Sequence, residues 1–164
     1  WLTSLQQHSP HIRNIGIAPG NRVSYVYPMA GNEAALGLYY PDQKEQWPAV
    51  KMIIANRKPM LAGPVRLQQS GTGLIYRIPV FLNNETYWGM VSTVLNFDTI
   101  YNAMHTRAKQ LGIKVAIKDR DQNGKILFGY NDIIANNELN LSIPGRNWQM
   151  VSSQKNTDAP QACE

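Results

Sequence analysis

The residues of this chain that could bind a metal or catalyse a reaction are few and widely spaced. His8 and His11 have a spacing that could bind a metal on a helix, but Pro10 lies between them, so we expect a solvated segment there. The remaining histidine, His105, has no such neighbour. No two carboxylates are placed for acid–base work, and no known nucleophile, phosphate-binding or zinc-protease motif occurs. We therefore expect no catalytic activity, no metal and no cofactor.

One acidic segment resembles the start of a calcium loop. It contains Asp119, Asp121, Asn123 and Gly124. Position twelve of such a loop needs a bidentate glutamate, and Tyr130 stands there instead. Asn-Gly between two segments of alternating hydrophobicity is a strong β-hairpin signal, so we predict a hairpin turn.

Composition favours a folded domain without disulfides. Hydrophobic residues make up 43% of the 164 residues and charged residues 16%, which allows a core and argues against disorder. The net charge of +5 comes from Lys and Arg residues spread along the chain, so we expect no nucleic-acid partner. Cys163 is the one cysteine, which excludes an intrachain disulfide. The chain begins at Trp1 and has no apolar run of about 18 residues, so we expect a piece of a longer protein.

The elements that would position these residues are mostly strands. Between Lys58 and Phe97, three strand-like segments are joined by the turn-forming residues 70–73 and 83–84. The predicted strands are 12–18, 22–27, 60–67, 74–82, 86–95, 114–119, 125–130, 140–143 and 148–152, and the predicted helices are 1–9, 41–55 and 97–111. Strands that follow one another through short turns pair antiparallel, so the fold class is α+β with antiparallel sheets.

The chain resembles the CHASE domain in four stretches, VSYVYPMAGNEAALGL, GPVRL after a helix and MLA, GLIYRIPVF, and YWGMVSTVLNF before an apolar helix. Their order and spacing extend the resemblance over residues 10–152. CHASE domains are extracytoplasmic sensors of bacterial diguanylate cyclases and histidine kinases and of plant cytokinin receptors. The resemblance implies two PAS-like subdomains, of which the membrane-distal one holds a small ligand. We expect residues 1–96 to form the distal subdomain, 97–153 a smaller membrane-proximal one, and 154–164 a linker or tail.

In a curved PAS-like sheet, alternate residues of each strand face the ligand. Similarity to the cytokinin-receptor pattern selects the phase, because its ligand-contacting positions fall at Leu61, near Gln69, and at Ile78 and Met90. The predicted ligand-binding residues are Tyr39, Leu61, Gly63, Gln69, Tyr76, Ile78, Trp88, Met90 and Ser92. The alternative is that these residues form a packed core without a ligand.

Two features of the sequence bear on the chemical class of the ligand. Tyr39 stands where the plant receptor has the aspartate that holds adenine, and a phenol lacks that charged acceptor, which argues against a cytokinin-like purine. Arg66 and Arg77 fall on the opposite strand phase, so they could bind an anion only if the predicted phase were reversed.

The resemblance implies the periplasmic sensor domain of an inner-membrane receptor, which binds a small molecule and acts as a homodimer. The expected output is a diguanylate cyclase (GGDEF) domain, with a histidine kinase as the alternative. Two other readings stay open. One is an interaction or dimerisation module without a small-molecule pocket. The other is a cytoplasmic PAS domain with flavin or haem, although no cysteine lies in the sheet and no histidine in the pocket strands.

Overall fold

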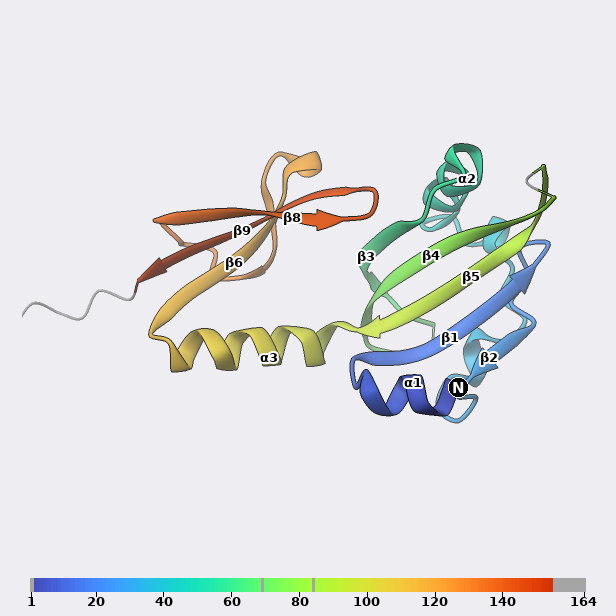
Figure 1. Cartoon of the computed structure of the whole chain (residues 1–164), viewed down its shortest axis with the longest axis horizontal. Helices are drawn as coiled ribbons and strands as arrows, with labels where there is room; N and C mark the ends of the chain where they lie inside the picture. The colour runs from blue at the N-terminus through green and yellow to red at the C-terminus, as the bar shows by residue number, and fades with distance from the viewer. Residues whose placement is uncertain (1, 69, 84, 155–164) are drawn as a thin grey trace, which may run out of the picture. The chain divides into compact units, whose positions relative to one another are not determined.

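A computed structural model describes residues 2–68, 70–83 and 85–154 (Figure 1). The chain divides into two compact units, residues 1–100 with 143–145 and residues 101–142 with 146–164. The division lies inside helix α3 (Phe97–Gln110), whereas the predicted boundary at Asn96 lies just before it. The assignment of distal and proximal subdomains stays a prediction. Of the predicted tail 154–164, only Gln154 lies within the described residues.

The first unit contains a five-stranded sheet with the order β2-β1-β5-β4-β3. Its strands are β1 (Ile12–Pro19), β2 (Tyr25–Tyr27), β3 (Met60–Arg66), β4 (Thr72–Leu82) and β5 (Thr86–Asn96). Its helices are α1 (Leu2–His8), η1 (Glu33–Ala35), η2 (Tyr40–Asp42) and α2 (Trp47–Asn56). Strand β1 pairs antiparallel with β2 and with β5, and β4 pairs antiparallel with β3 and with β5.

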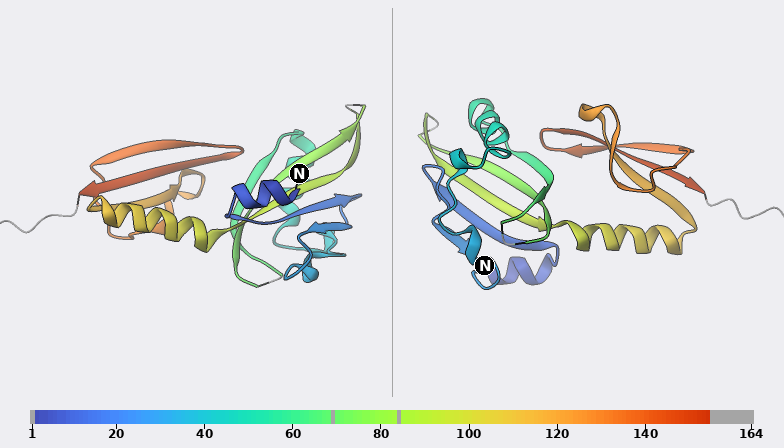
Figure 2. Two further views of the ribbon diagram at one scale, coloured as in Figure 1. Left: turned by 60° about the horizontal axis from the view of Figure 1, so that its bottom comes forward. Right: turned by 180° about the vertical axis from the view of Figure 1, so that it is seen from behind.

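Pairing of β1 with β5 joins the predicted N-terminal hairpin and the predicted three-stranded segment into one sheet. Each of these pieces alone would leave an edge strand with unpaired backbone groups, and the pairing satisfies both edges. As a result β5 lies at the centre of the sheet, and it leads directly into α3. Figure 2 shows this sheet from two further sides.

The core of the first unit lies between the sheet and the segment that connects β2 to β3. Met90 and Ala18 of the sheet and Val50 of α2 are completely buried there. Gln46 is the residue before α2, and Pro48 occupies the first turn, where its missing N–H costs no helical hydrogen bond. The segment between β2 and β3 thus covers one face of the sheet. The candidate site lies between this segment and the sheet.

The second unit contains a four-stranded sheet with the order β7-β6-β9-β8. Its elements are β6 (Ile113–Asp119), η3 (Arg120–Gln122), β7 (Lys125–Gly129), β8 (Asn137–Ile143) and β9 (Arg146–Gln154). Helix α3 contacts this sheet through an edge-to-face pair, Tyr101 and Phe128, whose ring centroids are 6.3 Å apart.

The predicted hairpin turn between β6 and β7 is confirmed. The two strands pair antiparallel, and Asn123 and Gly124 both have positive φ angles, 54° and 73°. The carboxylate of Asp119 accepts hydrogen bonds from the backbone N–H of Asp121 at 3.0 Å and from the side chain of Gln122 at 2.8 Å. The acidic residue therefore stabilises the turn.

None of the helices within the described residues has the length and apolar character needed to cross a bilayer.

Candidate functional site

A cavity lies on one face of the five-stranded sheet, and strand register fixes its floor. The registers align two adjacent rows across β1, β5 and β4, namely Asn14, Val94 and Ile75, and then Gly16, Ser92 and Arg77. All six residues line the cavity. The next row contains Ala18 and Met90, both fully buried in the hydrophobic core, which closes this end. The floor is therefore polar at Asn14, Ser92 and Arg77 and apolar at Val94 and Ile75.

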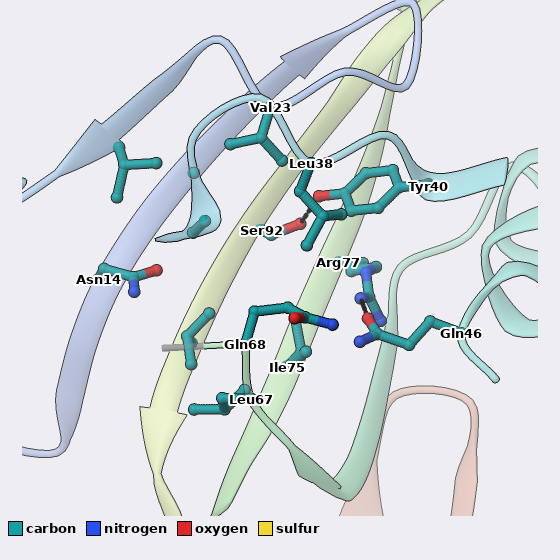
Figure 3. Close-up of a pocket in the computed structure, with 14 residues that line it drawn as sticks. Asn14, Val23, Leu38, Tyr40, Gln46, Leu67, Gln68, Ile75, Arg77 and Ser92 are labelled. Atoms are coloured by element: carbon teal, nitrogen blue, oxygen red, sulfur yellow. Dashed lines mark hydrogen bonds between the residues drawn. The ribbon is translucent and has the colours of Figure 1, made fainter. Parts of the chain in front are cut away.

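The segment between β2 and β3 supplies most of the walls (Figure 3). They consist of Val23, Val26, Ala35, Leu38, Tyr40 and Gln46, with Leu67 and Gln68 from the turn after β3. About 50 Å³ of the interior can hold the centre of a water molecule. A single water molecule fills roughly 10–15 Å³ of a cavity, so this one has room for several waters or one small organic molecule.

One buried hydrogen bond connects this wall to the floor. The hydroxyl groups of Tyr40 and Ser92 lie 2.9 Å apart, and Figure 3 shows them at one side of the cavity. Tyr40 is 4% exposed and Ser92 is 5% exposed. The pair fixes the η2 segment above the central strand.

The opposite end of the floor is held by a buried amide pair. Asn14 donates through Nδ2 to Oδ1 of Asn32 at 2.7 Å. Asn32 in turn donates to the backbone carbonyl of Pro28 at 3.1 Å, and its Oδ1 also accepts from Nε of Arg13 at 3.1 Å. These bonds fasten the start of the connecting segment to β1.

Arg77 carries a positive charge into the cavity and is 2% exposed. Its Nη2 donates to Oε1 of Gln46, and its guanidinium carbon lies 5.3 Å from the ring centroid of Tyr40. Its Nε, also buried, has no hydrogen-bond partner. Burial lowers the pKa of the guanidinium, an effect that Tyr40 opposes. Within the described part of the chain, no carboxylate forms an ion pair with Arg77.

This arrangement leaves Arg77 under-satisfied. A buried donor without a partner costs about 1–3 kcal/mol, and an unpaired buried charge costs more. A ligand with a negatively charged acceptor would therefore bind favourably in this cavity, because folding has already removed Arg77 from water.

Of the predicted ligand-binding residues, the structure places Ser92 in the floor of the cavity. Met90 lies on the same face of β5 as Ser92 but is buried in the hydrophobic core. Tyr39 packs under the guanidinium of Arg22 at 4.8 Å, while its neighbour Tyr40 lines the cavity. Gln69 lies outside the described residues. The other five, Leu61, Gly63, Tyr76, Ile78 and Trp88, are not among the residues that line this cavity. Ligand contact by any of the nine stays a prediction.

The strand phase explains this distribution. On β5 the predicted phase contains Trp88, Met90, Ser92 and Val94, of which Ser92 and Val94 line the cavity, Met90 lies in the core and Trp88 is 36% exposed. On β4 the opposite phase faces the cavity, because Ile75 and Arg77 line it whereas Tyr76 pairs with Leu61 on the other face. Arg77 therefore faces the cavity, as the binding of an anion by this residue would require.

No cluster of three or more His, Cys, Asp or Glu side chains with the spacing of a metal site occurs in the ranges 2–68, 70–83 and 85–154. His8 and His11 make separate hydrogen bonds, to the carbonyl of Ser4 at 2.8 Å and to the hydroxyl of Thr99 at 2.9 Å.

The second unit has a surface concavity of a different kind, lined by Arg120, Asp121, Asn140, Leu141, Asn147 and Trp148. There the carboxylate of Asp121 accepts from the backbone N–H and the side chain of Asn147, at 3.1 and 2.7 Å. These bonds lower the pKa of Asp121. The carboxylate is thus already partnered within the protein, and the buried donor without a partner in this lining, Nε1 of Trp148, is uncharged. The buried charge of Arg77 therefore makes the cavity of the first unit the stronger candidate site.

Comparisons with known proteins bear on the family and the fold of the chain. A family model described as the CHASE domain matches residues 4–128. An extracellular ligand binding receptor from Desulfohalobium retbaense DSM5692 has a similar structure, with a TM-score of 0.70 and 15% identity over 94% of this chain and 32% of that one. The chain therefore spans less than half the length of that receptor. No curated protein sequence matches the chain.

Two further solved structures share the fold. One is described as the extracellular domain of a histidine kinase, rpHK1S-Z16, with a TM-score of 0.62 and 10% identity over 93% of this chain and 74% of that one. The other is the ligand binding domain of the amino acid chemoreceptor PctC from Pseudomonas aeruginosa PAO1 in complex with GABA, with a TM-score of 0.57 and 12% identity over 90% and 75%.

These likenesses confirm the predicted α+β class with two antiparallel sheets. The family model covers most of the sequence and reaches from α1 into β7. The chain belongs to the CHASE domain family, and it is an extracytoplasmic sensor domain, not a catalytic one.

Proposed function

We propose that this domain is the periplasmic part of a bacterial inner-membrane receptor and that it binds a small molecule in the cavity over β1, β5 and β4. The observation that carries the proposal is the cavity itself, which combines an apolar interior with three buried polar groups, Asn14, Ser92 and Arg77. Ligand sites in proteins have this composition, an apolar lining with a few placed polar groups. The solved structures of similar fold include two named for ligand binding.

The proposed signal begins at the central strand. Ser92 and Val94 contact the cavity, and β5 continues without a loop into α3 at Phe97. A small molecule that binds one arrangement of the connecting segment more tightly shifts the population toward it, by no more than its difference in affinity. We propose that α3 transmits this shift within a homodimeric receptor. The proposed output is a diguanylate cyclase (GGDEF) domain, with a histidine kinase as the alternative.

A thermal-shift screen of the purified domain tests the proposal. The library contains amino acids, small carboxylates, purines, peptides and phenolic metabolites. A compound at 100 times its Kd adds about 2.7 kcal/mol to the free energy of unfolding, which raises the midpoint visibly. We expect a dose-dependent increase for at least one class.

Gly16→Val provides the control, because it fills the floor of the cavity. A Cβ at Gly16 would meet its nearest atoms at 3.8 Å, and valine suits a strand, so the variant should fold and lose the shift. A flat screen, with no co-purified molecule found by native mass spectrometry, would instead favour an interaction module.

A further inference from the structure

The single charged side chain among the described residues that line the cavity is Arg77. The rest of the lining is apolar or neutral, with hydroxyls at Tyr40 and Ser92 and amides at Asn14, Gln46 and Gln68. A ligand that matched this charge would carry one negative charge. A second negative charge would find no second cation in the described lining.

We propose that this domain senses a small monocarboxylate, with its carboxylate bound by Arg77 and its carbon chain lying along the apolar part of the floor toward Asn14. The inference rests on the proposed function and names the ligand class of that site. Arg77 lines the cavity and forms no ion pair with a carboxylate of the described residues, and a carboxylate is the acceptor that matches the charge and planar fork of a guanidinium.

The carbon chain would lie on the two rows that contain Arg77 and Asn14. Ile75 adjoins Arg77 on the cavity face of β4, and Val94 links Ile75 to Asn14 across the sheet. Leu38 and Leu67 form walls of the same space, and Figure 3 shows Arg77 and Asn14 at opposite sides of it. The cavity volume of about 50 Å³ suits a short chain.

The lining also discriminates against amino acids. An α-amino acid brings an ammonium group, which loses its hydration in the cavity and needs a carboxylate there. No described residue of the lining carries one. Asp42 and Glu45 instead line a groove on the surface, beside Gln46 and Gln68. A carboxylate with an uncharged chain therefore fits this site better than the matching amino acid does.

The test uses isothermal titration calorimetry and thermal shift on the domain. The probes are the straight-chain carboxylates from acetate to hexanoate, each compared with its primary amide and its α-amino acid. We expect at least one carboxylate to bind, and to bind at least about tenfold more tightly than its amide, because hydrogen bonds to charged groups are the stronger kind. The amino acid of the same chain length should bind more weakly than the carboxylate.

Arg77→Met should remove carboxylate binding. It should leave the melting temperature of the free domain unchanged or higher, because it removes an unpaired buried charge. Arg66→Met is the matched control, since Arg66 is exposed on β3 and does not line the cavity. Should Arg77→Met fail to fold, Arg77→Lys keeps the charge without the planar fork and should weaken binding. The comparison of carboxylate with amide needs no variant.

Three results would overturn the inference. In the first, an amide binds as tightly as its carboxylate, and in the second, Arg77→Met binds the carboxylate as the unmodified domain does. Either leaves the sensor function standing with another ligand class. In the third, no carboxylate binds while another class in the wider library does. If the whole library is flat, the proposed function fails as well.

Discussion

At the scale of single residues, the hydrogen bond between Tyr40 and Ser92 joins the segment between β2 and β3 to the central strand β5. Both hydroxyls are buried, and they lie 2.9 Å apart. Tyr40→Phe and Ser92→Ala each leave the other hydroxyl in the core, and we expect each to lower the free energy of unfolding by about 1–3 kcal/mol. The double variant should cost less than the sum, because it removes both polar groups.

Urea denaturation of the four proteins in this double-mutant cycle measures the coupling. Purely additive effects would mean that the two hydroxyls do not bond to each other in solution.

Tyr87 gives a prediction for the pH dependence of stability. Its hydroxyl donates to Oδ1 of Asn21 at 2.7 Å, and burial raises the pKa of Tyr87 to about 12. In the unfolded chain the pKa is about 10. The folded state therefore keeps the proton longer, so stability is complete below pH 10 and falls as the pH rises toward 12.

Chemical denaturation between pH 9 and 12 checks this, with Tyr87→Phe as the comparison. The variant should show a shallower fall over that interval. Equal slopes for both proteins would contradict the raised pKa of Tyr87.

At the scale of elements, two glycines on neighbouring strands have opposite roles. A Cβ at Gly89 of β5 would come within 2.4 Å of the carbonyl oxygen of Ala18 on β1, so the close pairing of these strands requires glycine there. At Gly16 of β1 the nearest atoms would be 3.8 Å away. We expect Gly89→Ala to destabilise the domain by at least about 1–3 kcal/mol. Gly16→Ala should be neutral or stabilise it by up to about 1 kcal/mol.

Thermal or urea unfolding of the two variants side by side measures the difference. If Gly89→Ala were as stable as Gly16→Ala, the β1–β5 register would be wrong.

The predicted boundaries of most strands lie within a few residues of the observed ones, because they depend on local alternation and on turn residues. The phase of β4 could not be obtained in the same way. Leu74 and Ile75 are adjacent, point to opposite faces, and are both buried, so alternation does not say which face is covered. Arg77 then suggests an outward face, since an arginine is rarely fully buried. The structure buries it beneath Tyr40 and Gln46.

At the scale of the whole molecule, the two units have their own sheets and cores, and the candidate site belongs to the first. Trp148, Val151 and Ala116 are buried in the second unit, where the buried carboxylate of Asp119 is hydrogen-bonded in the β6–β7 turn, whereas the buried Arg77 of the first unit borders a cavity. Within the first unit, the hydrophobic core and the candidate site thus lie on neighbouring rows of the same sheet. The row of Ala18 and Met90 is buried in the hydrophobic core, and the neighbouring row of Ser92 and Arg77 borders the cavity.

The sequence by itself determined the α+β class, the succession of strands and helices, the hairpin at Asn123-Gly124 and the family. These depend on hydrophobic period, turn chemistry and the order of short motifs, all of which are local or linear along the chain. The tertiary structure alone decided that β1 pairs with β5 and that the segment between β2 and β3 covers one face of the sheet. It also decided that this cover buries Arg77 without a carboxylate partner within the described residues. Such facts depend on contacts between distant segments, which the period of a single strand does not encode.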